Sequence, residues 1–216
     1  SGAPAYWPWT QILRSCVASI DRAEMNDHLA AFPDLAHVVP ELRPRVPALP
    51  EHGSAPEPEQ GRFRVLDAAT SLLRQAAAAR PLVLLLDDLH AADQSSLLLL
   101  RFLARELRAM PVLVAGTYRD AEAARDPVVA GILADVLREG ERIPLRGLEP
   151  AAVARYIAAA APEGVSRATV DEVCAVTEGN PLFVSEVVRL WRAEPGREDG
   201  PGLAIPDELR AAIRQR

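Results

Sequence analysis

An uninterrupted apolar run, Leu82 to Leu86, constrains the fold of this 216-residue chain more than any other feature. A short run of this kind, entered by Pro81, is typical of a strand that is buried on both faces. Two aspartates, Asp87 and Asp88, follow it directly. A carboxylate pair there is costly unless another group compensates its charge. Because ligands of open parallel sheets bind just beyond the carboxyl ends of the strands, the pattern predicts a polar site at this edge.

Strand and helix patterns alternate after residue 80. The expected elements are strands 82–86, 112–117 and 142–145 and helices 94–108 and 127–138. Asp93 is placed to cap the first of these helices. An alternation of this kind predicts parallel strands joined by right-handed crossovers, which makes the fold class α/β.

Helical patterns flank this region on both sides. They cover residues 9–20, 25–32, 34–39 and 63–79 before it, and 150–160, 166–177, 181–193 and 207–214 after it. Residues 40–60 hold six prolines, which favours a surface loop, and a second polar loop is expected at 195–201. We place the domain boundary near Gly147, which gives an α/β domain over 1–147 and a helical domain over 148–216.

Composition excludes several classes of protein. Apolar residues make up 49% and charged residues 25% of the chain, which is typical of a globular protein. A net charge of -6 gives no electrostatic reason for this segment to bind DNA. No apolar stretch is long enough for a bilayer, so no membrane contact is expected. Two distant cysteines, Cys16 and Cys174, indicate a reducing compartment and two small core residues rather than a disulfide framework.

All 24 basic residues are arginine. A phosphate-binding loop of the G-x-x-x-x-G-K-[ST] type needs a lysine that reaches the β- and γ-phosphates. The sequence therefore contains no such loop, and its glycines do not fall at that spacing either.

Three residues are candidates for phosphate chemistry. Asp87 suits Mg²⁺, bound directly or through water, and Asp88 suits the orientation or deprotonation of an attacking water. Arg119 follows the strand at 112–117, so parallel pairing brings it to the same edge, where a guanidinium could contact a γ-phosphate. The structural alternatives are a pair of capping or solvated acids and a surface arginine paired with Asp120. His90 lacks a metal-ligand partner at a useful spacing and is expected to be a hydrogen-bonded turn residue.

Gly179, Asn180 and Pro181 separate two expected helices. Because glycine can end one helix and proline can begin the next, a purely structural role is sufficient for this tripeptide.

Four segments together resemble a known family. They are GAPAYWPWTQILR at 2–14, LVLLLDDLHAADQSSLLLLRFLAREL at 82–107, VLVAGTYRD at 112–120 and TEGNPLFVSEVVR at 177–189. They are similar to the STAND class of AAA+ ATPases, and most similar to the ATPase modules of large bacterial LuxR-type transcriptional regulators and of some adenylate or guanylate cyclases.

The resemblance implies a role for each motif. It makes 82–88 the Walker B strand, with Asp87 as the magnesium acid and Asp88 as the catalytic acid. It makes 117–119 the sensor-1 position, with Arg119 on the γ-phosphate. It also makes Gly179, Asn180 and Pro181 the GxP motif, whose proline packs on the adenine. The cofactors it implies are ATP and Mg²⁺.

The sequence departs from the family at its front. In the family, the phosphate loop and two strands precede the GAPAYW segment, and DNA-binding parts follow the helical domain. We therefore expect an interior fragment or a truncated gene product. Its fold would be an incomplete P-loop NTPase-like parallel sheet with three strands kept, followed by an all-α lid domain and, at the C-terminus, the start of another domain. Alone, it is expected to bind ATP weakly or not at all.

The function expected of the parent protein is a slow, cytoplasmic ATPase switch in bacterial signalling or transcription. DNA contact would come only through a module outside this chain, and a homo-oligomer is an open option. The alternatives are a non-catalytic protein-interaction scaffold and the ATPase part of a cyclase.

Overall fold

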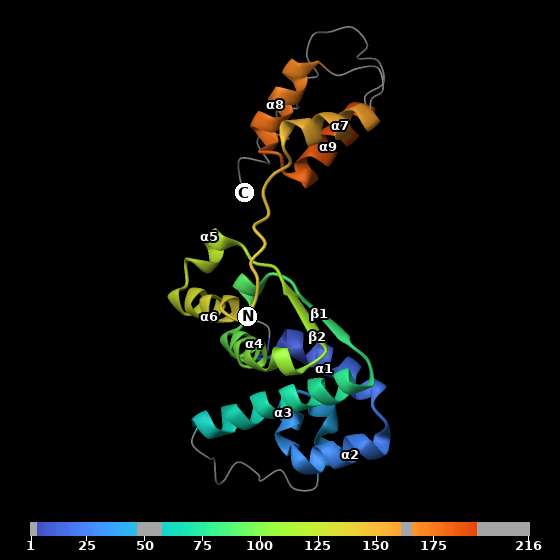
Figure 1. Cartoon of the computed structure of the whole chain (residues 1–216), viewed down its shortest axis with the longest axis vertical. Coiled ribbons are helices and arrows are strands. Elements are labelled where there is room, and N and C mark those ends of the chain that lie inside the picture. The colour runs from blue at the N-terminus through green and yellow to red at the C-terminus, as the bar shows by residue number, and fades with distance from the viewer. Residues whose placement is uncertain (1–3, 47–57, 161–165, 194–216) are drawn as a thin grey trace. The chain divides into compact units, whose positions relative to one another are not determined.

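The computed structural model describes residues 4–46, 58–160 and 166–193 of the chain (Figure 1). The chain divides into two compact units, Ser1–Arg142 and Ile143–Arg216. Each unit has its own apolar core in the described part of the chain.

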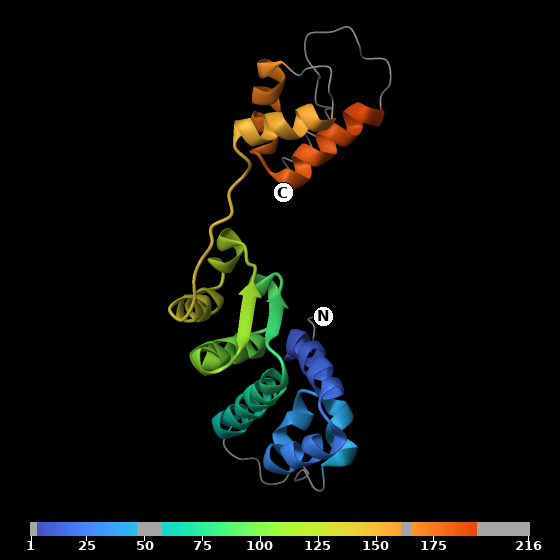
Figure 2. The same ribbon diagram turned by 45° about the vertical axis from the view of Figure 1, so that its right-hand side comes forward.

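A two-stranded parallel sheet lies in the first unit. Strand β1 (Leu82–Leu86) pairs with β2 (Val112–Gly116) in a register that aligns Leu82 with Val112 and Leu86 with Gly116. Figure 2 shows the two arrows side by side and pointing the same way. Helix α4 (Gln94–Glu106) lies in the crossover between the strands, so an α/β arrangement with parallel strands is confirmed.

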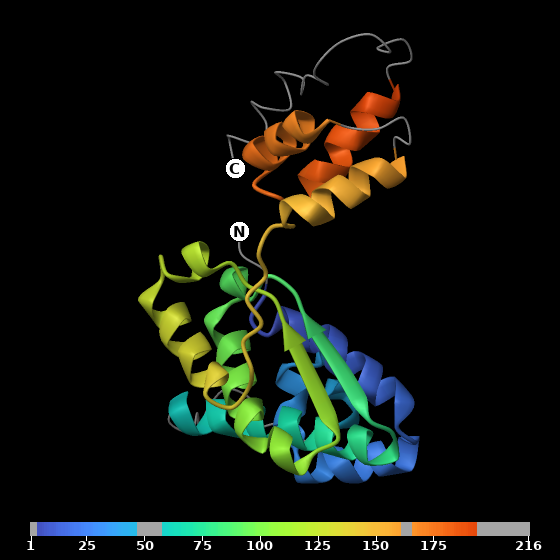
Figure 3. The same cartoon turned by 45° about the horizontal axis from the view of Figure 1, so that its top comes forward.

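Among the described residues the sheet is covered on one face only, so the prediction of a strand buried on both faces is wrong. Leu84 and Leu86 are buried, whereas Val83, Leu85 and Leu113 are 64%, 75% and 61% exposed. In Figure 3 the two strands lie in front of helix α1 (Trp7–Ser19). The alternation follows from the period of two along a strand: with helices on one side, every second side chain stays in solvent.

The third strand expected at 142–145 does not form. Residues 141–149 have no regular secondary structure, and Ile143 and Leu145 are 74% and 89% exposed. Pro144 lies within this segment and has no N–H group to give to a sheet ladder, which weakens it as a strand. Among the described residues the sheet therefore has two strands.

Three helices before the sheet supply a large part of the first core. They are α1, α2 (Arg22–Ala31) and α3 (Pro58–Ala79). The buried Trp9 of α1 donates a hydrogen bond from its indole Nε1 to the carbonyl of Ser96 in α4, at 2.9 Å. This contact joins two segments that are 87 residues apart and ties the N-terminal helix to the crossover helix.

Two short 3₁₀ helices, η1 (Pro33–His37) and η2 (Pro40–Arg45), follow α2. The prediction of a loop from residue 40 is therefore wrong for its first part. Leu42 and Val46 are buried and anchor this turn to the core, and proline suits the first position of such a helix. Residues 47–57 of the expected loop lie outside the described residues.

The predicted cap at the start of α4 forms. The Asp93 carboxylate accepts a hydrogen bond from the backbone N–H of Ser96 at 3.0 Å, so the predicted cap of α4 is confirmed.

Short helical turns follow both strands. The 3₁₀ helix η3 (Leu89–Ala91) follows β1, and the short α-helix α5 (Asp120–Ala123) follows β2. Another 3₁₀ turn, η4 (Leu107–Ala109), ends α4, and α6 (Pro127–Leu137) packs against α4.

The second unit is helical, as expected. Its described helices are α7 (Pro150–Ala160), α8 (Arg167–Thr177) and α9 (Pro181–Ala193). Fully buried Val153, Ile157, Val173, Val184 and Val187 form its core. The loop expected at 195–201 and the helix expected at 207–214 lie outside the described residues, as does the start of a further domain.

Candidate functional site

The carboxyl ends of β1 and β2 meet at Thr117. Its hydroxyl donates a hydrogen bond to the Asp87 carboxylate and accepts one from the backbone N–H of Asp88, at 3.0 Å. Asp87 follows β1 directly and Thr117 follows β2 directly, so the sheet register alone brings them together. Both side chains are exposed. The result is a carboxylate held at the solvated edge of the sheet by a neutral donor.

Backbone hydrogen bonds fix this edge. The N–H of Thr117 donates to the carbonyl of Leu86 at 2.9 Å, and the N–H of Leu89 donates to the carbonyl of Thr117 at 2.8 Å. Gly116 makes the arrangement possible, because a Cβ there would lie 2.5 Å from the Leu89 Cδ1 atom. The turn after β1 is thus locked against the end of β2 before any side chain of the site is considered.

Asp88 has a left-handed backbone conformation, with φ 54° and ψ 47°. Aspartate tolerates this region better than most residues, although the conformation costs it more free energy than it costs glycine. The conformation turns the chain out of β1 into η3. The Asp88 side chain is 62% exposed, and its Oδ1 atom lies 3.8 Å from Nδ1 of His90.

His90 and Glu122 hold Arg119 at the same edge. The backbone N–H of Arg119 donates to Nδ1 of His90 at 3.3 Å, and Nε2 of His90 contacts the Glu122 carboxylate at 3.1 Å. The guanidinium of Arg119 donates to the other oxygen of Glu122 at 3.3 Å. The expectation that His90 is a hydrogen-bonded turn residue is confirmed.

The structural alternative for Arg119 was a pair with Asp120, and the structure has different partners. Asp120 pairs with Arg142 at 2.7 Å, whereas Arg119 pairs with Glu122. The described residues therefore bring Asp87, Asp88 and Arg119 to one edge of the sheet, with Thr117, His90 and Glu122 as the connecting groups.

Comparison of the sequence with models of protein families identifies the family of this chain. The model of the AAA ATPase domain matches residues 1–115. The chain belongs to the AAA ATPase domain family. No curated protein and no solved structure matches the chain.

Membership of the AAA ATPase domain family makes this chain a nucleotide-binding type of module, of a family that generally binds ATP with Mg²⁺. The matched residues include Asp87 and Asp88 and end before Thr117 and Arg119. In the described part of the chain, no helix is both long and apolar enough to span a bilayer.

The edge of this AAA ATPase domain fits Mg²⁺ but not the whole of Mg-ATP. Magnesium is usually held by one or two carboxylates plus substrate phosphates, and Asp87 has no cationic partner among the described residues. No group of three or more metal-ligating side chains occurs in the described ranges. A phosphate-binding lysine is missing from the sequence, and the guanidinium of Arg119 is engaged with Glu122.

Gly179, Asn180 and Pro181 lie in the second unit and form the junction between α8 and α9. Gly179 has φ 70°, and its carbonyl accepts a hydrogen bond from the N–H of Leu148 at 2.7 Å. A Cβ on Gly179 would lie 2.3 Å from the Leu148 carbonyl oxygen, so only glycine fits. The Asn180 side chain accepts from the N–H of Leu182 at 3.0 Å and caps α9. The structural role of this tripeptide is therefore present.

The resemblance placed Thr117 within the sensor-1 position, but the hydrogen bonds of Thr117 to Asp87 and Asp88 were not predicted, and Glu122 was not identified as part of the site. The signal for Thr117 was available, because it is the first residue after β2 just as Asp87 is the first after β1. Glu122 lies in the short helix α5, and no apolar periodicity in the sequence predicts this helix. The contact of Glu122 with His90 could therefore not be predicted from the sequence.

Proposed function

We propose that this chain is the acid and sensor part of a STAND-class ATPase switch in a bacterial signalling or transcriptional regulator. The single observation that carries the proposal is the hydrogen-bonded edge at which Thr117 joins Asp87 to Asp88. Arg119 stands at the same edge through His90. The family match over residues 1–115 supports the nucleotide-binding half of the proposal.

Each side chain has a separate task in this proposal. Asp87 holds Mg²⁺, and Thr117 keeps its carboxylate in one orientation by donating to one oxygen. Asp88 orients the attacking water or accepts its proton. When bound, Mg²⁺ neutralises charge on the transferring phosphate. Phosphoryl transfer depends mainly on positioning and charge stabilisation, so a few fixed groups are sufficient once a phosphate-binding loop is supplied.

Arg119 acts as the sensor of the γ-phosphate. Its guanidinium donates to Glu122 at 3.3 Å and is 64% exposed, so this is a weak surface pair. A phosphate carries more negative charge than one carboxylate and binds arginine in a fork geometry, so it can displace Glu122. Because Glu122 also contacts His90, the exchange would alter α5 and thereby report the nucleotide state.

The helical second unit has a proposed role in nucleotide binding through its GxP motif. In the proposal, Pro181 packs on the adenine, and Gly179 and Asn180 shape the turn that presents it. The output of the nucleotide state would pass to DNA through a module outside this chain. Two free cysteines that lie far apart in the sequence, Cys16 and Cys174, favour a cytoplasmic location.

Calorimetric titration with Mg-ATP tests the proposal. The 216-residue chain should bind weakly or not at all, because it holds no lysine loop. Micromolar binding by this chain alone would show that the proposed division of the site is wrong.

The coding sequence upstream of Ser1 provides the second test. A glycine-rich loop that ends in lysine-serine or lysine-threonine supports the switch, and a gene product that includes it should hydrolyse ATP slowly. Asp87→Asn and Asp88→Asn should both abolish that hydrolysis, whereas Asp27→Asn, an exposed acid on α2, should leave it unchanged. A start codon at this position with no such loop would favour the non-catalytic interaction scaffold, and an adjoining cyclase domain would make the chain a cyclase regulator.

A further inference from the structure

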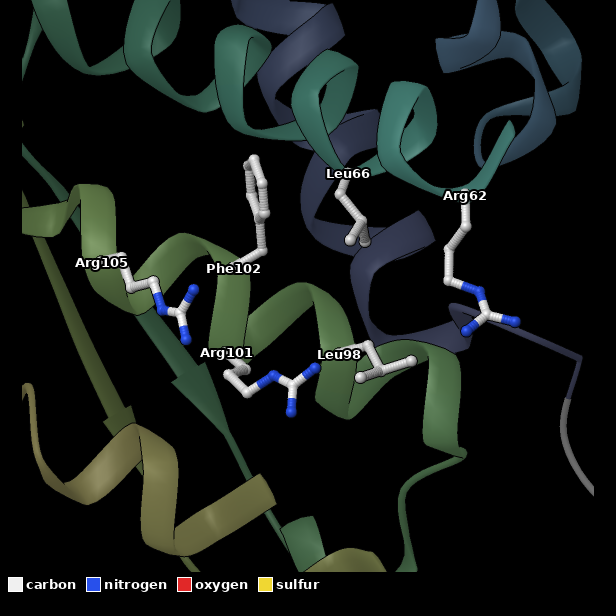
Figure 4. Close-up of a pocket in the computed structure, with 6 residues that line it drawn as sticks. All are labelled: Arg62, Leu66, Leu98, Arg101, Phe102 and Arg105. Atoms are coloured by element: carbon white, nitrogen blue, oxygen red, sulfur yellow. The ribbon is translucent and has the colours of Figure 1, made fainter. Parts of the chain in front are cut away.

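A small groove lies between α3 and α4, away from the sheet edge described above (Figure 4). Its volume is about 150 Å³. The residues that line it are Arg62, Leu66, Leu98, Arg101, Phe102 and Arg105. Three guanidinium groups thus surround a strip of apolar side chains.

The described residues neutralise the positive charge of this groove only in part. Arg62 and Arg105 are exposed and form no ion pair in the described part of the chain, and Arg101 shares the Asp135 carboxylate at 3.3 Å. Asp135 is shared further, because Arg138 pairs with it at 2.6 Å. The groove is therefore a local basic site on a chain whose net charge is -6.

Two other arginines of α3 differ from these. Arg64 pairs with Asp34 at 3.0 Å, and Arg74 pairs with Glu106 at 2.9 Å. On α3, the lack of an ion pair at Arg62 among the described residues is thus a property of the groove rather than of the whole helix.

The floor of the groove is apolar. Leu66 is buried, whereas Leu98 and Phe102 are partly buried and keep surface on the groove. Phe63 packs edge-on against Phe102, with ring centroids 5.5 Å apart, and is itself 57% exposed. This adds an apolar rim that an incoming side chain could contact.

The size of the groove selects the class of ligand. Sites for nucleotides and other small molecules usually have volumes of roughly 300–1,000 Å³. A groove of about 150 Å³ is too small for them but can hold one large apolar side chain. The surrounding guanidinium groups match carboxylates, with which arginine forms paired hydrogen bonds.

We propose that the groove between α3 and α4 binds an acidic peptide segment of a partner protein. One apolar side chain of the peptide enters between Leu66, Leu98 and Phe102. Carboxylates that flank it pair with the guanidinium groups of Arg62, Arg101 and Arg105. This interaction does not depend on the nucleotide site, so it holds whether or not the proposed ATPase function is correct.

Selection from a library of random peptides displayed on phage tests the proposal, with the folded 216-residue chain as bait. The enriched peptides should carry acidic residues on both sides of a leucine, phenylalanine or other large apolar residue. A synthetic copy of the most enriched peptide then serves as the probe in fluorescence anisotropy. Its affinity should fall as salt is added, because exposed charges are screened.

Three variants locate the binding. Arg105→Gln and Phe102→Leu should each weaken the peptide about tenfold, and Arg101→Gln should weaken it similarly. Arg108→Gln is the matched control, because Arg108 lies just beyond α4, is 80% exposed and pairs with Glu139 outside the groove. It should bind the peptide like the parent chain.

Several results would overturn the proposal. One is that the enriched peptides lack acidic residues. Another is that the Arg105→Gln variant and the parent chain bind the synthetic peptide equally well. A third is that inorganic phosphate displaces the peptide at equal concentration. Preferential binding of vesicles rich in anionic lipid, or a second copy of the chain occupying the groove, would overturn it as well.

Discussion

The hydroxyl of Thr117, at the end of β2, donates a hydrogen bond to the carboxylate of Asp87, at the end of β1. The same hydroxyl accepts the backbone N–H of Asp88 at 3.0 Å. One side chain therefore fixes both the orientation of the first aspartate and the backbone of the second. It does so without a positive charge, which leaves the Asp87 carboxylate free to attract a cation.

Thr117→Val removes this bridge while preserving the shape of the side chain. The free energy of unfolding should fall by about 1 kcal/mol, because one exposed set of hydrogen bonds is lost. Thr117→Ser keeps the hydroxyl and should remain close to the parent. Urea unfolding measures both, and equal loss in the two variants would contradict the role of the hydroxyl.

Asp88 tests the left-handed turn after β1. Asp88→Asn should change the free energy of unfolding by no more than about 0.5 kcal/mol, because asparagine tolerates this conformation. Asp88→Val should cost about 1–2 kcal/mol, because a β-branched side chain is strained at φ 54°. Thermal unfolding of the two variants provides the comparison, and an unperturbed valine variant would argue against the turn.

Leu85 and Leu86 are adjacent and point to opposite faces of β1. Leu86 is 5% exposed, so Leu86→Ala should cost about 2–5 kcal/mol. Leu85 is 75% exposed, so Leu85→Ala should cost less than about 0.5 kcal/mol. Similar losses on chemical unfolding would mean that the second face of the sheet is covered.

His28 should make stability depend on pH. The side chain is buried, and this desolvation lowers its pKa from the usual 6.5. The unfolded chain therefore binds a proton at a pH where the folded chain does not. The contribution of neutral His28 to the free energy of unfolding is fully present above about pH 6.5, and it is lost as the pH falls toward the lowered pKa of the folded state.

His28→Gln removes this titration and should flatten the acid limb of the stability curve, measured by urea unfolding at a series of pH values. His37→Gln is the control, because the His37 side chain is 48% exposed. A parent curve that His28→Gln leaves unaltered would contradict the assignment.

The sequence was a good guide where local chemistry decides the structure. The run 82–86 became β1, Asp93 capped α4, and Pro181 began α9, because each depends on nearby residues alone. It was a poor guide where the outcome depends on what packs against an element. An apolar run cannot distinguish coverage on two faces from coverage on one, and the segment around Pro144 showed strand-like composition without a partner edge.

The site followed the same division. The positions of Asp87 and Arg119 at one edge could be predicted, because parallel strands bring their carboxyl ends together. The links through His90 and Glu122 could not, because they depend on side-chain directions in η3 and α5.

Paramagnetic relaxation by Mn²⁺, used in place of Mg²⁺, tests the central claim most directly. In the 216-residue chain, added Mn²⁺ should broaden the amide signals of Asp88, Leu89 and Thr117 first, and Asp87→Asn should abolish this effect. Broadening that begins at other surface carboxylates, or that persists at Thr117 in Asp87→Asn, would contradict the account.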